Sequence, residues 1–352
     1  MAKIDIIIPV YNTKRYISYC LDSVLKQDYE DYRIIVIDDK STDGSLDLLR
    51  VYKEKFPDKI TLIESPINVG AASSRNLGLE NATSEYVTFL DSDDRLAPGI
   101  LKKVDKVSRL YTPDIISSDL HLNINGINAD FLGMKNSHFK QNRLIIPEEE
   151  KMHIYQERPG VTSKFIRREL IGDNRFPNGL KWEDYAFMIP FFIKAKSIYI
   201  LEDTGYYYSV NPFGTTTTDM FCLPSHILDI FDGSDFILSK LSDEEKKYYQ
   251  YELRVVKTMN CLNRVRDLAL TRGIRKTDLI LLSNLLVNLI NLREGDYHEL
   301  AWYQYQYNNS KFYKFRMSKI EKMLNSSLQQ ETDENKLKEN IKLLTRTYEK
   351  RK

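Results

Sequence analysis

The chain has 352 residues, of which 42% are hydrophobic, and its net formal charge at pH 7 is +1. A chain of this length is expected to form two domains, with enough apolar residues for a sizeable buried core. The nearly balanced charge argues against a dedicated nucleic-acid-binding protein, which is usually basic. The three cysteines, Cys20, Cys222 and Cys261, show neither metal-ligand spacing nor a disulfide framework, which favours a reducing compartment.

The N-terminal residues do not form a secretory signal, because Lys3 and Asp5 interrupt the apolar stretch and no cleavage-site pattern follows. The richest apolar stretch, residues 279–292, is interrupted by one serine and three asparagines and does not qualify as a membrane span. We therefore expect a cytoplasmic protein, and peripheral contact with the inner face of the cell membrane is the alternative that stays open.

The first 112 residues alternate short apolar runs with helical patterns. In residues 15–26, for example, Ile17, Leu21 and Val24 share one face of a helix. Buried strands are predicted at residues 4–10, 34–37, 60–63 and 86–90, and helices at 15–26, 45–55, 71–81 and 98–109, the last with Pro98 in its first turn. This alternation predicts an α/β fold with a mostly parallel sheet covered by helices on both faces.

Residues 113–200 have a mixed pattern of short strands, with a polar loop at 123–142 and a helix that begins near Trp182. A tyrosine-rich strand and a threonine-rich loop follow at residues 206–218. From residue 224 onward the pattern is helical.

The acidic residues after Ser242 are typical of a helix start, and we expect this helix to continue to Thr271. The whole helical part is expected to serve assembly or acceptor placement. The predicted domains are residues 1–222, with halves at 1–112 and 113–222, and a C-terminal helical domain at 223–352.

Polar residues follow three of the predicted strands. Tyr11 and Asn12 follow the first strand, Asp38 and Asp39 end the second, and residues 91–94 follow the fourth. Sheets of this class bind ligands at the C-terminal ends of their strands. The pattern therefore predicts a binding site at one edge of the sheet.

Asp91, Asp93 and Asp94 come directly after the apolar strand at 86–90. Carboxylates two positions apart, where the chain turns, can bind one hard cation. A divalent ion there would bridge the phosphates of a diphosphate leaving group. The alternative is a solvated turn with an Asx cap before the next helix.

Asp39 needs an explanation, because aspartate is a poor strand residue. A hydrogen bond from a nucleobase N–H is one explanation. The alternative is a turn that serves the next helix, in which Ser41, Thr42 or Asp43 is the N-cap.

Residues 68–76 combine small side chains with Arg75. Small residues let the backbone approach a ligand closely, and the guanidinium donors of Arg75 suit a phosphate. The alternative for Arg75 is an ion pair with Asp91 or Asp94, and the two roles can coexist.

Glu183 and Asp184 open a helix far downstream in the chain. The helix macrodipole alone favours acidic residues in a first turn. A carboxylate placed there is also a candidate general base for a reaction that deprotonates a hydroxyl.

In order and spacing these segments resemble glycosyltransferase family 2, which has the GT-A fold, over roughly residues 4–218. The resemblance is carried by Ile8–Asn12, Asp38–Gly44, Asn68–Val69–Gly70 with Ala72, Arg75 and Asn76, the Asp-X-Asp motif at 91–93, and Glu183–Asp184. It implies an inverting enzyme that moves a sugar from a UDP-sugar to a hydroxyl of a glycan, cell-surface polymer or glycoprotein. It also implies Mn²⁺ or Mg²⁺ as cofactor.

The resemblance implies a donor site built from the first half of the chain. Pro9, Tyr11 and Asp39 would hold the uracil and ribose, whereas Asn68 and Arg75 would support the nucleotide and its diphosphate. The complete set of expected nucleotide-sugar contacts is Pro9, Tyr11, Asn12, Asp39, Asn68, Arg75, Asp91 and Ser92.

The same resemblance implies a metal site and a catalytic pair. Asp93 would ligate the divalent metal together with Asp91, which would also contact the ribose or sugar. Asp184 would be the general base, and Glu183 would orient it or bind the acceptor.

One segment departs from the family pattern. Many relatives have an arginine after the tyrosine-rich strand, but here Tyr206–Tyr208 is followed by Ser209–Gly214 without one. The threonines at 215–218 would form a lid over the diphosphate, and the metal and Arg75 would then carry more of the leaving-group charge.

Seven aromatic residues lie among basic ones at residues 302–315. They would dock on a membrane surface or on a partner chain, including a second copy of this chain. Packing between helices is the alternative that we favour, because aromatic side chains commonly form cores.

Two other functions are weighed against a transferase. A sugar-1-phosphate nucleotidyltransferase would need a glycine-rich, basic phosphate loop after the first strand, where the chain has Tyr11–Lys14. A non-catalytic scaffold on the GT-A fold would be expected to lose Asp93 or Asp184, and both are present.

Overall fold

A computed structural model of the protein describes residues 3–124, 127–128, 142–151, 153–209, 226–257, 260–261, 339, 341–343 and 345–346. The chain divides into two compact units. Unit 1 comprises Met1–His153, Glu157–Gly179 and Glu183–Asn211, and unit 2 comprises Ile154–Gln156, Leu180–Trp182 and Pro212–Lys352. The predicted domain boundary at residue 222 lies outside the described residues and stays a prediction.

Ten strands of the described part form one sheet. They are β1 (Ile4–Val10), β2 (Tyr32–Asp38), β3 (Ile60–Glu64), β4 (Tyr86–Phe89), β5 (Arg95–Leu96), β6 (Ile115–Ile124), β7 (Ile127–Asn128), β8 (Arg143–Ile145), β9 (Lys164–Arg167) and β10 (Ile198–Ser209). The helices are α1 (Ile17–Leu25), α2 (Ser45–Lys55), α3 (Gly70–Glu80), α4 (Ile100–Tyr111), α5 (His153–Gln156), α6 (Arg168–Ile171), α7 (Glu183–Lys194), α9 (His226–Ser239) and α10 (Asp243–Tyr248).

The sheet has the order β3-β2-β1-β4-β9-β6-β10-β5, with β7 beside β6 and β8 beside β10. Strands β3, β2, β1 and β4 are parallel neighbours, which confirms the α/β fold and the parallel sheet predicted for the first half. Strand β9 lies antiparallel between β4 and β6 and joins the two halves of the sheet.

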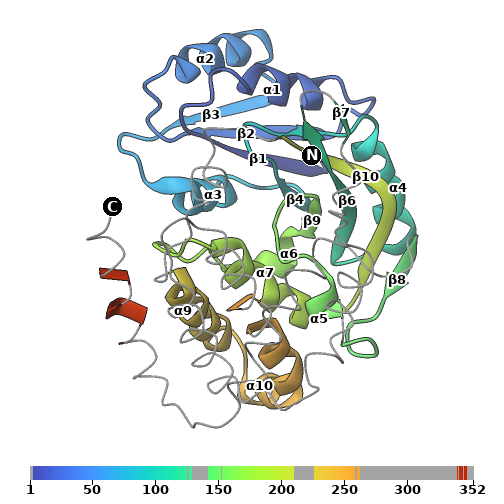
Figure 1. Ribbon diagram of the computed structural model, residues 1–352. Helices are drawn as coiled ribbons and strands as arrows, with labels where there is room; N and C mark the ends of the chain where they lie inside the picture. The colour runs from blue at the N-terminus through green and yellow to red at the C-terminus, as the bar shows by residue number, and fades with distance from the viewer. Residues whose placement is uncertain are drawn as a thin grey trace. The chain divides into compact units, whose positions relative to one another are not determined.

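Strand β1 is buried on both faces, as expected for a central parallel strand. Ile6 and Ile8 belong to a core cluster with residues of α1 and α2. Ile7 faces the other side, where α3 lies (Figure 1). Gly78 of α3 approaches this strand so closely that a Cβ there would lie 2.4 Å from Cγ2 of Ile7. The absence of a side chain at Gly78 therefore sets the spacing between α3 and the sheet.

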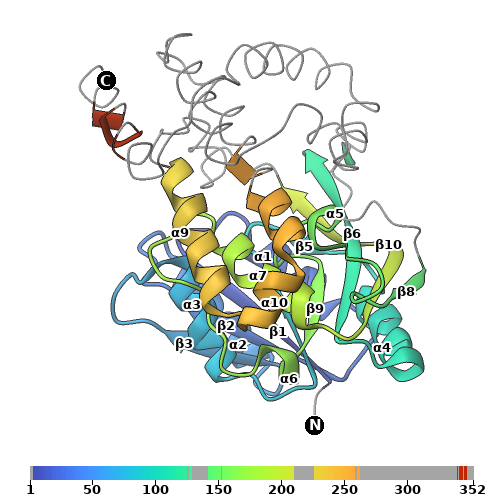
Figure 2. The same ribbon diagram turned by 90° about the horizontal axis from the view of Figure 1, so that it is seen from below.

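Helix α4 contacts β6 and β10, and its buried residues Ile100, Leu101 and Val104 belong to the same core cluster as Ile6 and Ile8 (Figures 1 and 2). The prediction that this helix opens with Pro98 in its first turn is wrong. The helix begins at Ile100, because Gly99 has φ 73, which is outside the range of a right-handed helix.

Unit 2 has the helix start predicted at Ser242. The Ser242 hydroxyl accepts the Glu245 backbone N–H, and the Glu245 carboxylate accepts the Ser242 N–H, which completes a capping box. The helix does not run unbroken to Thr271, because α10 ends before a turn at Tyr249 and residues 250–257 form a further helical stretch. Residues 262–271 lie outside the described part.

Two sequence expectations about environment are addressed by the described residues. Cys20 and Cys261 are free and buried, whereas Cys222 is not described. In the part of the chain that the structure covers, no helix combines the length and the apolar composition that a bilayer crossing requires.

Candidate active site

The loops after β1, β2 and β4 lie at one edge of the sheet, because these three strands are direct neighbours. Side chains join the loops to one another. The Asn12 N–H donates to the Ser41 hydroxyl at 3.1 Å, and the Asn12 amide oxygen accepts the Thr42 N–H at 2.8 Å. The Thr13 hydroxyl donates to the Ser92 hydroxyl at 3.0 Å. The predicted convergence of three polar strand ends is therefore found.

Asp39 is buried beneath the loop that leads into α3. One carboxylate oxygen accepts the Val69 N–H at 2.7 Å, and the other accepts the Gly70 N–H at 2.8 Å. The Asn68 amide donates to the Asp39 backbone carbonyl at 3.2 Å. Because each carboxylate oxygen can accept more than one hydrogen bond, a further bond from a nucleobase is compatible with this arrangement. The nucleotide roles of Asp39 and Asn68 stay predictions.

Tyr11 lies beside Asp39, since the Asp39 N–H donates to the carbonyl of the preceding residue, Val10, at 2.8 Å. The Tyr11 side chain is largely exposed, and Pro9 is half-buried in β1. An exposed ring next to a buried carboxylate suits a planar base. No described contact tests this role.

The alternative explanation for the second strand end, in which Ser41, Thr42 or Asp43 is the N-cap of α2, is wrong, although Asp43 still binds the first residue of the helix. The Asp43 carboxylate accepts the Ser45 N–H at 2.9 Å, whereas Gly44 occupies the N-cap position without a side-chain bond. Ser41 and Thr42 bind Asn12 instead. These polar residues therefore hold the loops of the site together more than they cap the helix.

The turn at residues 91–94 alternates partly exposed and buried side chains. Asp91 and Asp93 are partly exposed, whereas Ser92 and Asp94 are buried. The Asp94 N–H donates to the Asp91 carbonyl at 3.0 Å and closes the turn. The two carboxylates that the motif predicts as metal ligands are thus the two that remain accessible.

Asp94 is held by Tyr206 and Ser209 of β10. The Tyr206 hydroxyl donates to one Asp94 oxygen at 2.6 Å, and the Ser209 N–H donates to the other at 2.7 Å. Burial, together with the charges of Asp91 and Asp93, raises the pKa of Asp94 well above its ordinary value. Burial and the Asp94 charge also raise the pKa of Tyr206, so its hydroxyl keeps its proton. The pairing of Tyr206 with Asp94 was not predicted from the sequence.

The donor set around Asp91 and Asp93 fits a divalent cation that shares its coordination with a ligand. No cluster of three or more His, Cys, Asp or Glu side chains suited to a metal occurs among the described residues. Mg²⁺-type sites in nucleotide enzymes commonly use one or two carboxylates plus substrate phosphates and water. Two accessible carboxylates in one turn match the protein's share of this requirement.

Arg75 is the centre of the site. Its Nη2 donates to Asp91 at 2.9 Å, while Nη1 donates to Glu183 at 2.7 Å and lies 3.5 Å from Asp184. The Arg75 side chain is only 6% exposed. Burial opposes its charge, but the three carboxylates outweigh burial and raise the pKa of Arg75, so it stays cationic.

Of the two sequence interpretations of Arg75, the ion pair is found, with Asp91 but not with Asp94. These carboxylates take three of the five N–H donors of the guanidinium, and no described contact of Arg75 tests a bond to a diphosphate. The phosphate role of Arg75 stays a prediction. In this structure Arg75 instead brings the strand end at Asp91 and the helix start at Glu183 into one cluster, although Arg75 and Glu183 are 108 residues apart in sequence.

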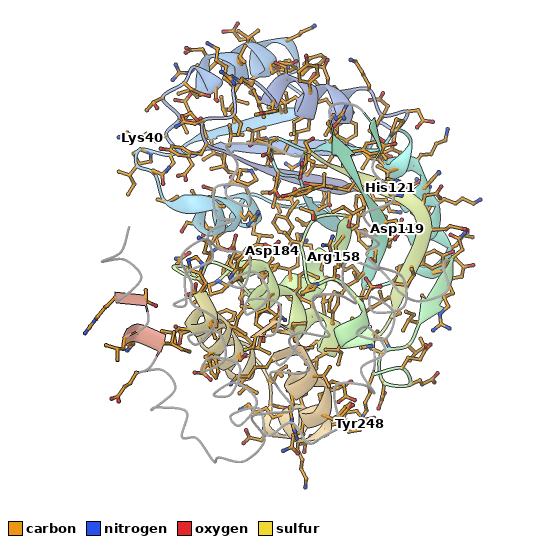
Figure 3. The ribbon with its side chains drawn as sticks, viewed as in Figure 1. Lys40, Asp119, His121, Arg158, Asp184 and Tyr248 are labelled. Carbon is orange, nitrogen blue, oxygen red and sulfur yellow. The ribbon has the colours of Figure 1, made fainter. Side chains whose placement is uncertain are left out.

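Asp184 lies in the first turn of α7 (Figure 3). Its second carboxylate oxygen accepts the Val161 N–H at 3.3 Å, and the side chain keeps 32% exposure. Burial raises the pKa of Asp184, Arg75 lowers it, and the charges of Glu183 and Asp91 raise it further, to about 7. A carboxylate with this pKa, open on one side, is suited to accept a proton near neutral pH.

Phe176 supports the cluster and was not singled out from the sequence. The centre of its ring lies 5.5 Å from Cζ of Arg75. The ring also stacks on Phe187 of α7, with 3.7 Å between the two ring centres. The backbone of Phe176 is held on both sides by the Asn76 side chain, which accepts its N–H and donates to its carbonyl. The only sequence signal for this contact is the Arg75–Asn76 pair in the motif.

Several sequence expectations fall on residues that are not described. These are the threonine lid at 215–218, the segment after Ser209 where relatives have an arginine, and the aromatic stretch at 302–315.

Comparison with known proteins places the chain among glycosyltransferases. The model of the family "Glycosyl transferase family 2" matches residues 5–156. A poly(ribitol-phosphate) beta-glucosyltransferase of Bacillus spizizenii is 34% identical over 288 residues, which are 78% of this chain and 42% of that protein. An uncharacterized glycosyltransferase of Haemophilus influenzae is 33% identical over 193 residues, or 54% of this chain and 71% of that protein.

The fold has a counterpart among solved structures. S. aureus TarS 1-349 in complex with UDP-GlcNAc superposes with a TM-score of 0.64 at 22% identity, covering 99% of this chain and 92% of that one. The chain spans about two fifths of the length of the curated relatives that match it over the longest stretch. With the ordered motifs, the sheet and the clustered carboxylates, these similarities show that the chain belongs to glycosyl transferase family 2.

Proposed function

We propose that the protein transfers a sugar from a UDP-sugar to a hydroxyl of a cell-surface polymer, with inversion at the anomeric carbon. The observation that carries the proposal is the Arg75 cluster, which joins Asp91 at the donor end of the sheet to Glu183 and Asp184. Relatives support the substrate classes, because one acts on poly(ribitol-phosphate) and a structure of similar fold binds UDP-GlcNAc.

The donor would lie at the strand edge after β1, β2 and β4. Tyr11 and Asp39 would contact the uracil, and Asp91 the ribose or sugar. Asp93, with Asp91, would hold a divalent ion, which when bound neutralises charge on the departing diphosphate. This assignment agrees with the accessibility of these two carboxylates in a turn whose other side chains are buried.

The acceptor hydroxyl would be activated by Asp184. The hydroxyl proton moves to a carboxylate oxygen of Asp184 as the acceptor oxygen bonds to the anomeric carbon. The bond from that carbon to the phosphate oxygen breaks, and UDP leaves with the electron pair. Attack from the face opposite the diphosphate inverts the anomeric centre, so an α-linked UDP-sugar gives a β-glycoside.

Arg75 would position the base while leaving it ionisable. Its Nη1 donates to Glu183 and lies near Asp184, and its Nη2 holds Asp91. A single buried guanidinium thus fixes the distance between the donor side and the base. Because Glu183 takes the short bond of 2.7 Å, Asp184 is left free enough to accept a proton.

A donor screen tests the proposal. The protein is incubated with UDP-glucose, UDP-GlcNAc and UDP-galactose, with Mn²⁺ or with excess chelator, and UDP release is measured with and without poly(ribitol-phosphate). We expect metal-dependent release with at least one donor, faster with acceptor, and a β-linked product by NMR. An α-linked product would contradict inversion. Pyrophosphate release from a nucleoside triphosphate and a sugar phosphate would instead identify a nucleotidyltransferase.

A further inference from the structure

The pairing of strand β4 with strand β1 ends just before the Asp-X-Asp turn. The Leu90 N–H still donates to the Ile7 carbonyl of β1 at 3.0 Å. The next backbone N–H, that of Asp91, donates to the Tyr206 hydroxyl at 3.2 Å. A side chain from β10 therefore takes over where the strand pairing ends, at the first residue of the turn.

The same hydroxyl donates its own proton to Asp94 at 2.6 Å. Tyr206 thus holds both ends of the four-residue turn, Asp91 through its backbone and Asp94 through its side chain. Tyr206 is fully buried, and the backbone of β10 is fixed independently by pairing with Leu96 of β5. The hydroxyl is therefore a rigid reference point for the turn.

We propose that Tyr206 and Asp94 form a positioning pair that sets the backbone of the turn at 91–94, so that Asp91 and Asp93 aim their carboxylates at one cation. This inference rests on the donor and metal roles proposed above for Asp91 and Asp93. Side chains behind metal ligands commonly control affinity by orienting those ligands.

Tyr206→Phe removes the hydroxyl and keeps the ring in the core. The Asp91 N–H and one Asp94 oxygen then both lose their partner, and Asp94 is left beside two other acidic residues. Relaxation of the turn moves the Asp91 and Asp93 carboxylates apart. The matched control is Tyr207→Phe, the next residue of β10, whose ring lies 6.0 Å from the guanidinium carbon of Arg95.

The test is the Mn²⁺ dependence of UDP binding, measured by titration calorimetry at a series of Mn²⁺ concentrations on the full chain. We expect Tyr206→Phe to need on the order of 10 to 100 times more Mn²⁺ for half-maximal UDP binding, as for other residues that orient metal ligands. Tyr207→Phe should match the unmodified protein. The acceptor KM of Tyr206→Phe, measured at saturating Mn²⁺, should be unchanged, which a general loss of structure would not allow.

Asp93→Asn separates failure of the pair from failure of the site. If Asp93→Asn abolishes the Mn²⁺ dependence while Tyr206→Phe keeps that of the unmodified protein, the positioning pair is refuted and the metal site stands. If Asp93→Asn also behaves as the unmodified protein, the proposed metal site itself is wrong.

If circular dichroism shows that Tyr206→Phe does not fold, the same titration is carried out on a second variant, Asp94→Asn. In Asp94→Asn the remaining side-chain oxygen can still accept the Tyr206 hydroxyl. The new NH₂ group cannot accept the Ser209 N–H, so that hydrogen bond is lost. We expect a weaker shift of the Mn²⁺ dependence in the same direction, and an unchanged dependence overturns the proposal. Where both single variants fold, the double variant should be no worse than the worse single one, because the two residues act on one turn.

Discussion

Two groups of acidic side chains meet at Arg75, and the protein holds them by different means. The turn at 91–94 is fixed by hydrogen bonds from β10 and by its own backbone, and it presents two accessible carboxylates. Glu183 and Asp184 at the start of α7 are fixed by a buried guanidinium, with one further bond from the Val161 N–H. Under the proposed function, carboxylates thus bind a cation in one place and accept a proton in the other.

The difference shows how environment divides roles among carboxylates. At the turn, Asp91, Asp93 and Asp94 place three carboxyl groups close together, which favours binding of a cation. At the helix start, burial brings the pKa of Asp184 to about 7, where a group exchanges protons readily. Four substitutions test these two roles and that of Asp39, and they follow in order of expected effect.

Asp184→Asn keeps the shape of the base but removes its ability to accept a proton. We expect turnover to fall by about 10²- to 10⁴-fold, the usual contribution of a positioned base. UDP affinity should be nearly unchanged, because the donor side is untouched. Steady-state kinetics and calorimetry on the same preparation check both values. Native turnover would move the base to Glu183, Asp94 or another group.

Asp93→Asn acts on the other carboxylate group. We expect the metal affinity, and with it the activity at low Mn²⁺, to drop by more than the roughly 10- to 100-fold typical of residues that only orient a ligand, because Asp93 is itself a proposed ligand. The pH profile should keep its form, since the base is unchanged. The measurement is activity across a Mn²⁺ series. Full activity of the unmodified protein in excess chelator would exclude the metal altogether.

Asp39→Ala tests whether the Asp39 carboxylate binds the nucleotide or only stabilises the fold. Loss of the acceptor for two N–H groups should lower the free energy of unfolding by about 1–3 kcal/mol. If Asp39 also binds the base, UDP affinity should fall about tenfold, the equivalent of one hydrogen bond of ~1.4 kcal/mol. Denaturant unfolding and calorimetry give the two values. Unchanged UDP affinity in the folded variant would leave Asp39 a structural residue.

Glu183→Gln should have the smallest effect, a shift of the pH profile. The base must be ionised, so kcat/KM should rise with pH through the pKa of Asp184, near 7. The Glu183 charge is one cause of that raised pKa, so its removal should move the rising limb to lower pH. If the rising limb of the pH profile stays in place or moves to higher pH, the expected effect of the Glu183 charge on the pKa of Asp184 is contradicted.

The first half of the fold was predictable because its signals are local. Strand β1 and helix α2 were predicted at their observed bounds, since apolar runs and helical periodicity lie within single segments. The start of α4 was misplaced, because Pro98 suits a first turn and the left-handed conformation of Gly99 leaves little trace in sequence. Strand β9 was not identified, because four residues that begin with a lysine carry no strand pattern of their own.

The site was predictable as residue types but not as contacts. Asp91, Asp93 and Asp184 stand out in the sequence, yet the partners of Arg75 depend on a contact across 108 residues. In the sequence, Tyr206 is one of four tyrosines in its strand, and nothing local sets it apart. Its separate role depends on which face of β10 is buried at the point where β4 ends, and this is a property of the sheet.

The absence of a side chain at Gly78 links the packing of the hydrophobic core to the position of Arg75 in the active site. A side chain there would push α3 away from Ile7 and Ile37. Arg75 lies one turn earlier on the same helix, so the guanidinium would move with it. Variation among homologues should therefore be narrow at position 78 and wide on the outer side of α3. A search for thermostable variants that fills small gaps in the core should leave this residue alone.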